Sequence, residues 1–353
     1  MAYTTIDDPS AHFQTAIYTG TGSSRSVTND GNSNLQPDLI WIKERDGTGS
    51  HAAFDSTRGV QKELKLDVAE AEATAAQSVT AFDSDGFTVG TAGDYNGSNN
   101  LQVAWQWKAN GGTRTTFNES GDNPGGGYQV NTTAGFSIVD WTGTGGAGTV
   151  SHGLGAAPQV IIVHDRGGNN HATFWHTLAT DPWTDYVRFD TDLVVTDDAG
   201  RWNDTAPGSS TFTVGNNNEV NGDDRTYVAW CFREIQGYSC IGTYRGGGTT
   251  DGTFVHTGFK PAMIILTKIS GTANWQIRDI KRDPFNDNTD QIIFPDLNDI
   301  EAASGNNIVD FLSNGFHMSG TGGDHNETDA DFIFIAFAHR PFVTSDGIPC
   351  TAQ

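Results

Sequence analysis

Four residues between positions 164 and 176 have side chains that could bind a transition metal. They are His164, Asp165, His171 and His176, and imidazole and carboxylate groups are common zinc ligands. If Asp165 and His171 flank one hairpin, their side chains would approach each other. The spacing therefore raises the question of a metal site.

Two related segments of the chain argue against a metal site that the segments share. At the comparable places one segment carries Glu44 and His51, and the other carries Lys268 and Asn274. A lysine ammonium is not a metal ligand and repels a cation. We therefore predict no metal and no other cofactor.

Two acidic turns, NGDD at 221–224 and DHNE at 324–327, offer oxygen atoms of the kind that calcium prefers. Neither turn matches the twelve-residue EF-hand loop. Solvated turns are the favoured interpretation, with calcium binding as the alternative.

The usual patterns of enzyme chemistry are missing. The chain has no Gly-x-Ser-x-Gly elbow, and Cys231 lies within an apolar strand pattern that is expected to be buried. The glycine run at 246–248 lacks the lysine and helix of a phosphate-binding loop. A carboxylate pair for glycoside hydrolysis is conceivable in so acidic a chain, but no two residues stand out. We predict that the protein is not an enzyme.

Three tryptophans, Trp183, Trp202 and Trp275, fall outside the best strand patterns. An exposed indole ring can stack on a sugar, so these residues are the candidates for glycan binding. The alternative, which we favour, is that they are core or interface residues, because tryptophan is usually largely buried.

Composition restricts the partners. The 353 residues carry 43 acidic and 20 basic side chains, for a net charge of −23, and a general nucleic-acid binder needs a basic surface. No run of about 18 apolar residues is present, so no membrane insertion is expected. Three cysteines make no disulfide framework, and the N-terminus lacks the features of a signal peptide. These features indicate synthesis in a reducing cytoplasm.

The residues above must be positioned by a threefold internal repeat. Four landmarks recur in the same order: a Gly/Thr turn, a proline-led apolar run, an aromatic residue near a glycine, and a closing strand. The turns are at 18–22, 141–145 and 242–246, and the runs are PDLIWI at 37–42, PQVIIV at 158–163 and PAMIIL at 261–266. The aromatic landmarks are at 85–90, 210–215 and 314–320, and the closing strands are VAWQW at 103–107, VAWCF at 228–232 and IAFAH at 335–339.

Each landmark predicts strand structure. Side chains alternate along a strand, so Val103, Trp105 and Trp107 should share one face while Ala104 occupies the other. The proline-led runs are apolar on both faces, as in central strands. Residues 63–77 hint at a helix or a loop.

The repeat predicts an all-β fold of three tandem, diverged β-sandwich domains. Their expected bounds are an N-terminal arm at 1–12, a first sandwich at 13–110, a linker at 111–134, a second sandwich at 135–235, a third at 236–342 and a tail at 343–353. The junction at 234–237 is very short, so the second and third copies should touch.

Several motifs resemble a repeat family of tailed-bacteriophage proteins that is frequent in marine phages. The resemblance runs from about residue 15 to 342, and its strings are AGFSIV at 134–139, SHGLG at 151–155, TGFKP at 257–261 and FLSNGF at 311–316. It implies a jelly-roll or concanavalin-like sandwich and no catalytic residues. It also implies a structural component of the virion, made in the cytoplasm of the host bacterium.

The resemblance favours a tail appendage or fibre subunit that works by assembly and host attachment. The alternatives are a capsid surface decoration protein and a lectin-like module that recognises host glycan. The expected partners are copies of the same chain, other virion proteins and a host surface glycan. A homotrimer is favoured because phage fibre subunits commonly trimerise.

Overall fold

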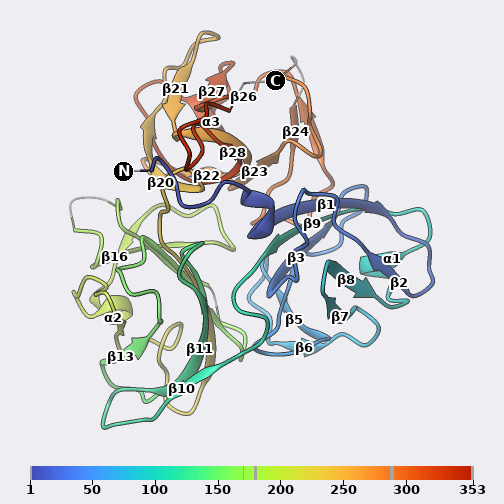
Figure 1. Ribbon diagram of the computed structural model, residues 1–353. Helices are drawn as coiled ribbons and strands as arrows, with labels where there is room; N and C mark the ends of the chain where they lie inside the picture. The colour runs from blue at the N-terminus through green and yellow to red at the C-terminus, as the bar shows by residue number, and fades with distance from the viewer. Residues whose placement is uncertain (1, 170, 179–180, 287–289, 351–353) are drawn as a thin grey trace.

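The computed structural model describes residues 2–169, 171–178, 181–286 and 290–350. The chain is all-β, with 43% of its residues in strands and 4% in helices, as predicted. Three lobes surround a common centre (Figure 1), and we call residues 13–110 the first lobe, 111–235 the second and 236–342 the third. No helix among the described residues is long and apolar enough to cross a membrane.

Each lobe has an inner sheet and an outer sheet, both antiparallel. The inner sheet of the first lobe has the order β1-β9-β3-β4-β5-β6, and the outer sheet has the order β2-β8-β7. The strands are β1 (Phe13–Thr19), β2 (Arg25–Val27), β3 (Leu39–Glu44), β4 (Ala52–Asp55), β5 (Lys62–Lys65), β6 (Ala73–Thr74), β7 (Val79–Asp83), β8 (Gly86–Val89) and β9 (Leu101–Trp107).

The second lobe repeats this plan with a larger inner sheet, of order β10-β11-β12-β19-β14-β15-β16-β17, facing the pair β13-β18. Its strands are β10 (Thr115–Phe117), β11 (Gly125–Asn131), β12 (Phe136–Thr142), β13 (Gly148–Ser151), β14 (Val160–Asp165), β15 (Ala172–Trp175), β16 (Asp185–Arg188), β17 (Thr196–Asp197), β18 (Thr211–Val214) and β19 (Thr226–Phe232).

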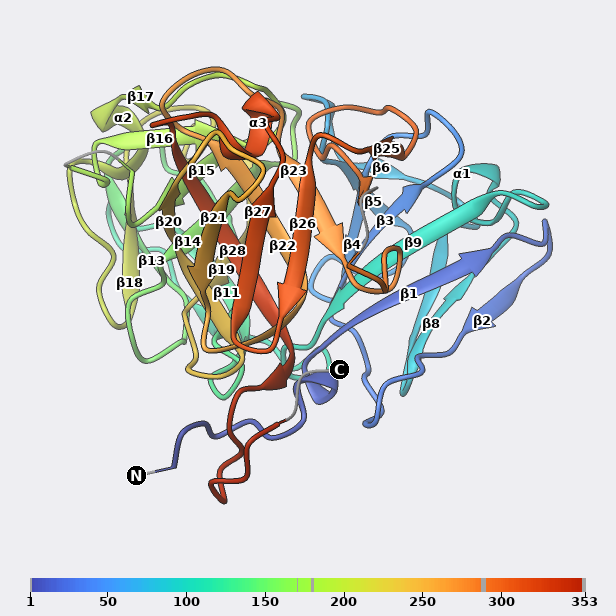
Figure 2. The same cartoon turned by 90° about the horizontal axis from the view of Figure 1, so that it is seen from above.

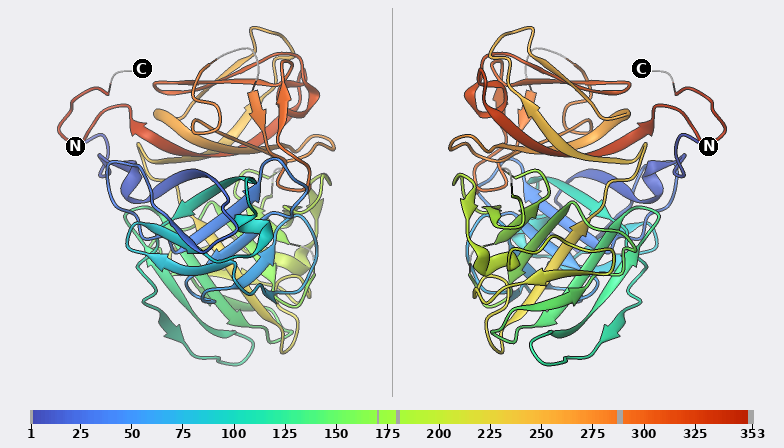
Figure 3. Two further views of the ribbon diagram at one scale, coloured as in Figure 1. Left: turned by 90° about the vertical axis from the view of Figure 1, so that its right-hand side faces the viewer. Right: turned by 90° about the vertical axis from the view of Figure 1, so that its left-hand side faces the viewer.

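The third lobe has an inner sheet of order β20-β28-β22-β23, an outer sheet of order β21-β27-β26 and the separate pair β24-β25. Its strands are β20 (Ser239–Arg245), β21 (Thr253–His256), β22 (Phe259–Lys268), β23 (Gln276–Asp279), β24 (Asp290–Ile292), β25 (Ala302–Ser304), β26 (Ile308–Leu312), β27 (Gly315–Ser319) and β28 (Asp331–Pro341). Figure 3 shows this lobe, in orange and red, seated across the other two.

The helical segments are short: η1 (Pro9–Ala11), α1 (Gly93–Asn96), α2 (Ala199–Trp202) and α3 (Gly323–Asn326). The first of these lies in the N-terminal arm. Both described ends of the chain lie on one side of the molecule (Figure 2). Asp7 of the arm accepts two hydrogen bonds from Ser345, at 2.5 and 2.6 Å, so the arm and the tail are joined.

The proline-led runs form equivalent central strands, as the repeat predicted. Each of β3, β14 and β22 lies between its closing strand and the next strand of the chain, in the orders β9-β3-β4, β19-β14-β15 and β28-β22-β23. Burial of both faces requires apolar residues at successive positions. The three runs are buried almost throughout.

The two faces of the closing strands line different cores. Trp105, Trp230 and Phe337 are at most 2% exposed, at equivalent positions, and all three lie in one central cluster with residues of every lobe. The alanines that alternate with them, Ala104 and Ala229 among them, face the core of their own sandwich. The large aromatic residues therefore hold the lobes to one another, while the small ones let the two sheets of one lobe approach.

Two segments differ from the sequence-based expectation. Residues 111–134, predicted as a linker, carry β10 and β11, and β11 pairs with β12 along seven residues. Residues 63–77 contain parts of β5 and the short strand β6 rather than a helix. In both segments strand pairing with a preformed sheet edge decides the structure, and local composition carries little information about such pairing.

Candidate functional site

Two of the three candidate sugar-stacking tryptophans lie in cores. Trp202 and Trp275 are each 2% exposed, and their indole N–H groups donate to the carbonyl oxygens of Asp185 at 3.0 Å and Arg188 at 2.9 Å. Neither ring has a face open to a ligand, so the stacking prediction is wrong for both. Trp183 is 36% exposed, and its role in glycan binding stays a prediction.

The histidine cluster is a buried structural contact. The Nδ1 atoms of His164 and His171 face each other, and both imidazoles are fully buried. Burial lowers the pKa of both rings, so both are neutral at pH 7. Asp165 instead pairs with Arg225 at 2.8 Å. Among the described residues no group of three or more His, Cys, Asp or Glu side chains could hold a metal ion.

The acidic turns examined for calcium contain a buried asparagine whose oxygen is already used. The Oδ1 atom accepts from a backbone N–H within the Gly/Thr turn or directly after it in every copy: Asn96 from Thr21, Asn221 from Thr144 and Asn326 from Gly247, at 2.8–3.1 Å. Their amide groups donate to further backbone or hydroxyl oxygens. We call these residues the asparagine latches.

The latches have a sequence signal that lies outside the four landmarks. Each latch lies the same distance along the chain after the glycine of the third landmark, namely Gly90, Gly215 or Gly320. A side chain that closes a turn in all three copies serves the fold common to them. The latches therefore indicate structure rather than a ligand site.

An ion-pair network crosses from the first lobe to the second. The guanidinium of Arg58 and the carboxylate of Asp55 are fully buried and lie 2.6 Å apart. Arg58 also contacts Glu72 at 3.2 Å, and Glu72 pairs with Arg166 of the second lobe at 2.8 Å. The backbone N–H of Glu72 donates to the carbonyl of Arg166 at 2.9 Å.

The third lobe makes the same network with the first. Arg282 and Asp279 lie 2.6 Å apart and are fully buried, Arg282 contacts Glu301 at 2.9 Å, and Glu301 pairs with Arg45 of the first lobe at 2.6 Å. The backbone N–H of Glu301 donates to the carbonyl of Arg45 at 2.7 Å. The Asp-x-x-Arg spacing at the end of β4 and β23 is the sequence signal for both networks.

The second lobe replaces the whole network by apolar side chains. At the positions of Asp55, Arg58 and Glu72 it carries Trp175, Leu178 and Val195, and the third lobe has Ile269 where the others have arginine. All four of these apolar residues lie in the central cluster or against it. Two lobe boundaries are thus ionic and one is apolar, and the three together close a ring.

The ring has a small void at its centre. It has a volume of about 20 Å³ and is lined by apolar side chains from all three lobes, Trp41, Trp230 and Phe337 among them. A space of this size holds at most one water, and water needs polar partners. The centre is therefore a packed core and not a ligand site.

A larger cavity of about 140 Å³ lies where the first lobe meets the third, and we call it the junction pocket. The arm, β1 and the turn at 30–32 form one side. The ends of β22 and β28 and the turn after β23 form the other. Charged and amide side chains line it together with a smaller number of apolar ones. None of its lining residues was a sequence-based candidate, because they come from segments remote in the chain.

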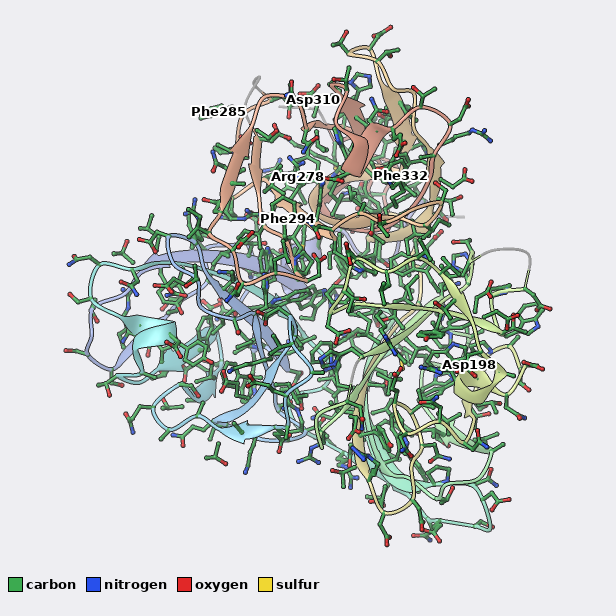
Figure 4. All side chains as sticks on the ribbon, turned by 180° about the vertical axis from the view of Figure 1, so that it is seen from behind. Asp198, Arg278, Phe285, Phe294, Asp310 and Phe332 are labelled. Carbon is green, nitrogen blue, oxygen red and sulfur yellow. The ribbon has the colours of Figure 1, made fainter. Side chains whose placement is uncertain are left out.

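Figure 4 shows where other charged and aromatic groups of the third lobe lie. Arg278 is enclosed within the lobe, with Nη1 at 3.0 Å from the Asp290 carboxylate, while Phe285 projects from its outer edge and is 74% exposed. Burial raises the pKa of Asp290 to about 6. This pair supports the sandwich between the inner and outer strands.

Comparison with known proteins identifies a family. No curated protein and no solved structure matches the chain. Residues 8–341 match the model of a family described as a domain of unknown function, DUF7483. The match includes all three lobes, and the chain therefore belongs to the DUF7483 family.

Proposed function

We propose that this chain is a structural subunit of a tailed-bacteriophage virion that acts by assembly and host attachment and has no catalytic activity. A tail appendage or fibre is the favoured location. The phage motifs described above motivate this placement, and the organisation of the charged residues supports a structural role.

The observation that carries the proposal is the closure of three repeats on one core. Glutamate and arginine side chains, which in an enzyme could serve chemistry, here join lobe to lobe, and buried aspartates hold two of these arginines in place. Arg58, Glu72, Arg282 and Glu301 each contact another charged side chain at a lobe boundary. Such a network favours a rigid building block, because each buried charge is held by partners that cannot move independently.

The same closure bears on the expected homotrimer. If each repeat were a chain of its own, three such chains could bury their apolar faces by forming a trimer. Here those faces are already buried within a single chain. The N-terminal arm lies on the third lobe of its own chain, where the Thr4 hydroxyl donates to the carbonyl of Gln236 at 2.8 Å. A trimer of whole chains stays a prediction and would have to use outer surfaces.

The test is to purify phage particles on a density gradient and to locate the chain in them by mass spectrometry and electron microscopy. We expect a fixed copy number per particle and density for the three-lobed body on the tail. Density on the capsid surface would favour a decoration protein instead. A chain that is made during infection and absent from purified particles would refute the virion proposal.

A further inference from the structure

The junction pocket is lined by more polar than apolar side chains. Asp8 of the arm and Asp30 and Asn32 of the first lobe supply hydrogen-bonding groups, and Arg340 and Lys281 of the third lobe supply cations. The apolar part comes from Phe13, Ala262, Ile280 and Ala338. A lining in which polar groups outnumber apolar ones suits a charged or hydroxylated ligand rather than an apolar one.

The third-lobe side of the junction pocket concentrates basic residues. Lys281, His339 and Arg340 line it. Lys260, opposite Arg340 in the antiparallel register of β22 and β28, is a fourth basic residue nearby. This concentration occurs in a chain with only 20 basic residues and a net charge of −23.

The two carboxylates of the pocket have different roles. Asp30 pairs with Lys281, with both oxygens at 2.7 Å from the ammonium. Asp8 accepts from the hydroxyl groups of Ser10 and Ser33, each at 2.6 Å. Arg340 forms no ion pair within the part of the chain that the structure describes. Its guanidinium is therefore the group available to a carboxylate from outside.

The size of the pocket restricts the ligand further. A protein cavity of about 150 Å³ is known to hold a benzene molecule, so 140 Å³ encloses one six-membered ring but not its substituents. Asp30, His339 and Arg340 of the lining are exposed, so the substituents of a bound ring can extend toward solvent. A dianion such as phosphate would be repelled by Asp8 and Asp30. A ring with one carboxylate and several hydroxyl groups can instead pair with Arg340 and donate to those two aspartates.

We propose that the junction pocket binds an acidic monosaccharide, a hexuronic acid unit. The carboxylate pairs with Arg340, the hydroxyl groups bond to Asp8, Asp30 and Asn32, and the apolar lining residues contact the ring. The ligand thus touches both lobes and closes the boundary between them. This inference goes beyond the virion proposal and holds wherever the chain is located.

The experiment is a calorimetric titration of the full-length protein with glucuronate, galacturonate, glucose and inorganic phosphate at low and at physiological salt. We expect binding of a uronate, no measurable binding of glucose, and weaker binding at the higher salt concentration. Arg340→Gln should weaken the uronate at least tenfold, and Lys281→Gln should weaken it less, because Asp30 already occupies that ammonium.

The matched control is Arg245→Gln, which removes an exposed arginine of the same lobe, paired with Asp329. It should leave uronate affinity unchanged, and all variants should keep the parent's melting temperature. Binding of phosphate without uronate, uronate affinity unaffected by Arg340→Gln, or no binding of either uronate would each overturn the proposal. None of these results depends on whether the chain is found in a virion.

Discussion

Replacing Arg282 by leucine should break the ionic boundary between the third and first lobes. The Arg282 side chain is fully buried. Its Nε atom donates to Asp279 at 2.6 Å, Nη1 to Glu301 at 2.9 Å and Nη2 to the carbonyl of Ile277 at 2.9 Å. The guanidinium carbon also lies 5.6 Å from the ring centroid of Trp105.

The loss in the free energy of unfolding depends on the groups that Arg282→Leu leaves without a partner. Asp279 stays buried with no cation beside it, although Trp105 and two backbone N–H groups still donate to it. Each hydrogen bond to a charged group contributes about 1.5–3 kcal/mol net. Burial of the leucine recovers part of the loss. Breaking a buried ion pair in this way costs about 3–5 kcal/mol in the free energy of unfolding.

The assay is urea denaturation at pH 7, because urea does not screen charges as a salt would. The control Arg245→Leu removes an exposed pair, with side chains 64% and 75% exposed, and should change stability by less than about 1 kcal/mol. Failure of Arg282→Leu to fold at all would agree with the reasoning. A cost for Arg282→Leu as small as that of the control would refute it.

The apolar boundary between the second and third lobes supplies a sharper version of the same test. Its side chains can be transferred as Asp279→Trp, Arg282→Leu, Glu301→Val and Arg45→Ile, which removes every charge of the network together. Replacing a whole buried ionic set by apolar residues is often neutral or stabilising. The fourfold variant should therefore be more stable than Arg282→Leu alone. If it is less stable, the two kinds of boundary are not interchangeable.

Four further outcomes follow from the structure. Trp230→Ala empties part of the central core and should cost about 3–5 kcal/mol, whereas a variant that melts like the parent would place Trp230 outside that core. Asn326→Ala removes one latch and should cost about 1–3 kcal/mol, since buried backbone groups lose their partners; the melting temperature is the readout. Burial raises the pKa of Asp296 to about 7, so the folded protein holds a proton that the unfolded chain releases near pH 4. The contribution of Asp296 to stability should therefore fall as pH rises from 4 to 7, whereas that of the buried neutral histidines rises. Asp296→Asn should therefore gain more stability than the parent over this pH range in urea titrations at several pH values. Trp183→Ala, at a partly exposed site, should change the free energy of unfolding by less than about 0.5 kcal/mol and should not alter uronate affinity. A loss of sugar binding in this variant would identify Trp183 as a stacking residue.

Local sequence patterns predict much of the architecture. The all-β class, the threefold repeat and the central place of the proline-led strands all rest on short-range patterns. Strand side chains alternate. The run Val103–Trp107 therefore predicts one face with two tryptophans and an opposite face with Ala104, even when the neighbouring strands are unknown. Burial of Trp105, Trp230 and Phe337 followed from that pattern.

What only the tertiary structure decided was where those faces meet. Local pattern does not distinguish a core inside one sandwich from a core shared by three, and the aromatic faces turned out to meet at the centre of the ring. Trp202 and Trp275 lie outside the strand patterns, so the sequence left glycan stacking open beside the favoured burial, and packing from other elements covers each of them. Arg45 meets Glu301, and Asp30 meets Lys281, across most of the chain's length. Such contacts form only when the lobes close. The Asp-x-x-Arg spacing marks the local part of each ionic network, but the remote partner depends on the geometry of the whole ring and has no local signal in the sequence.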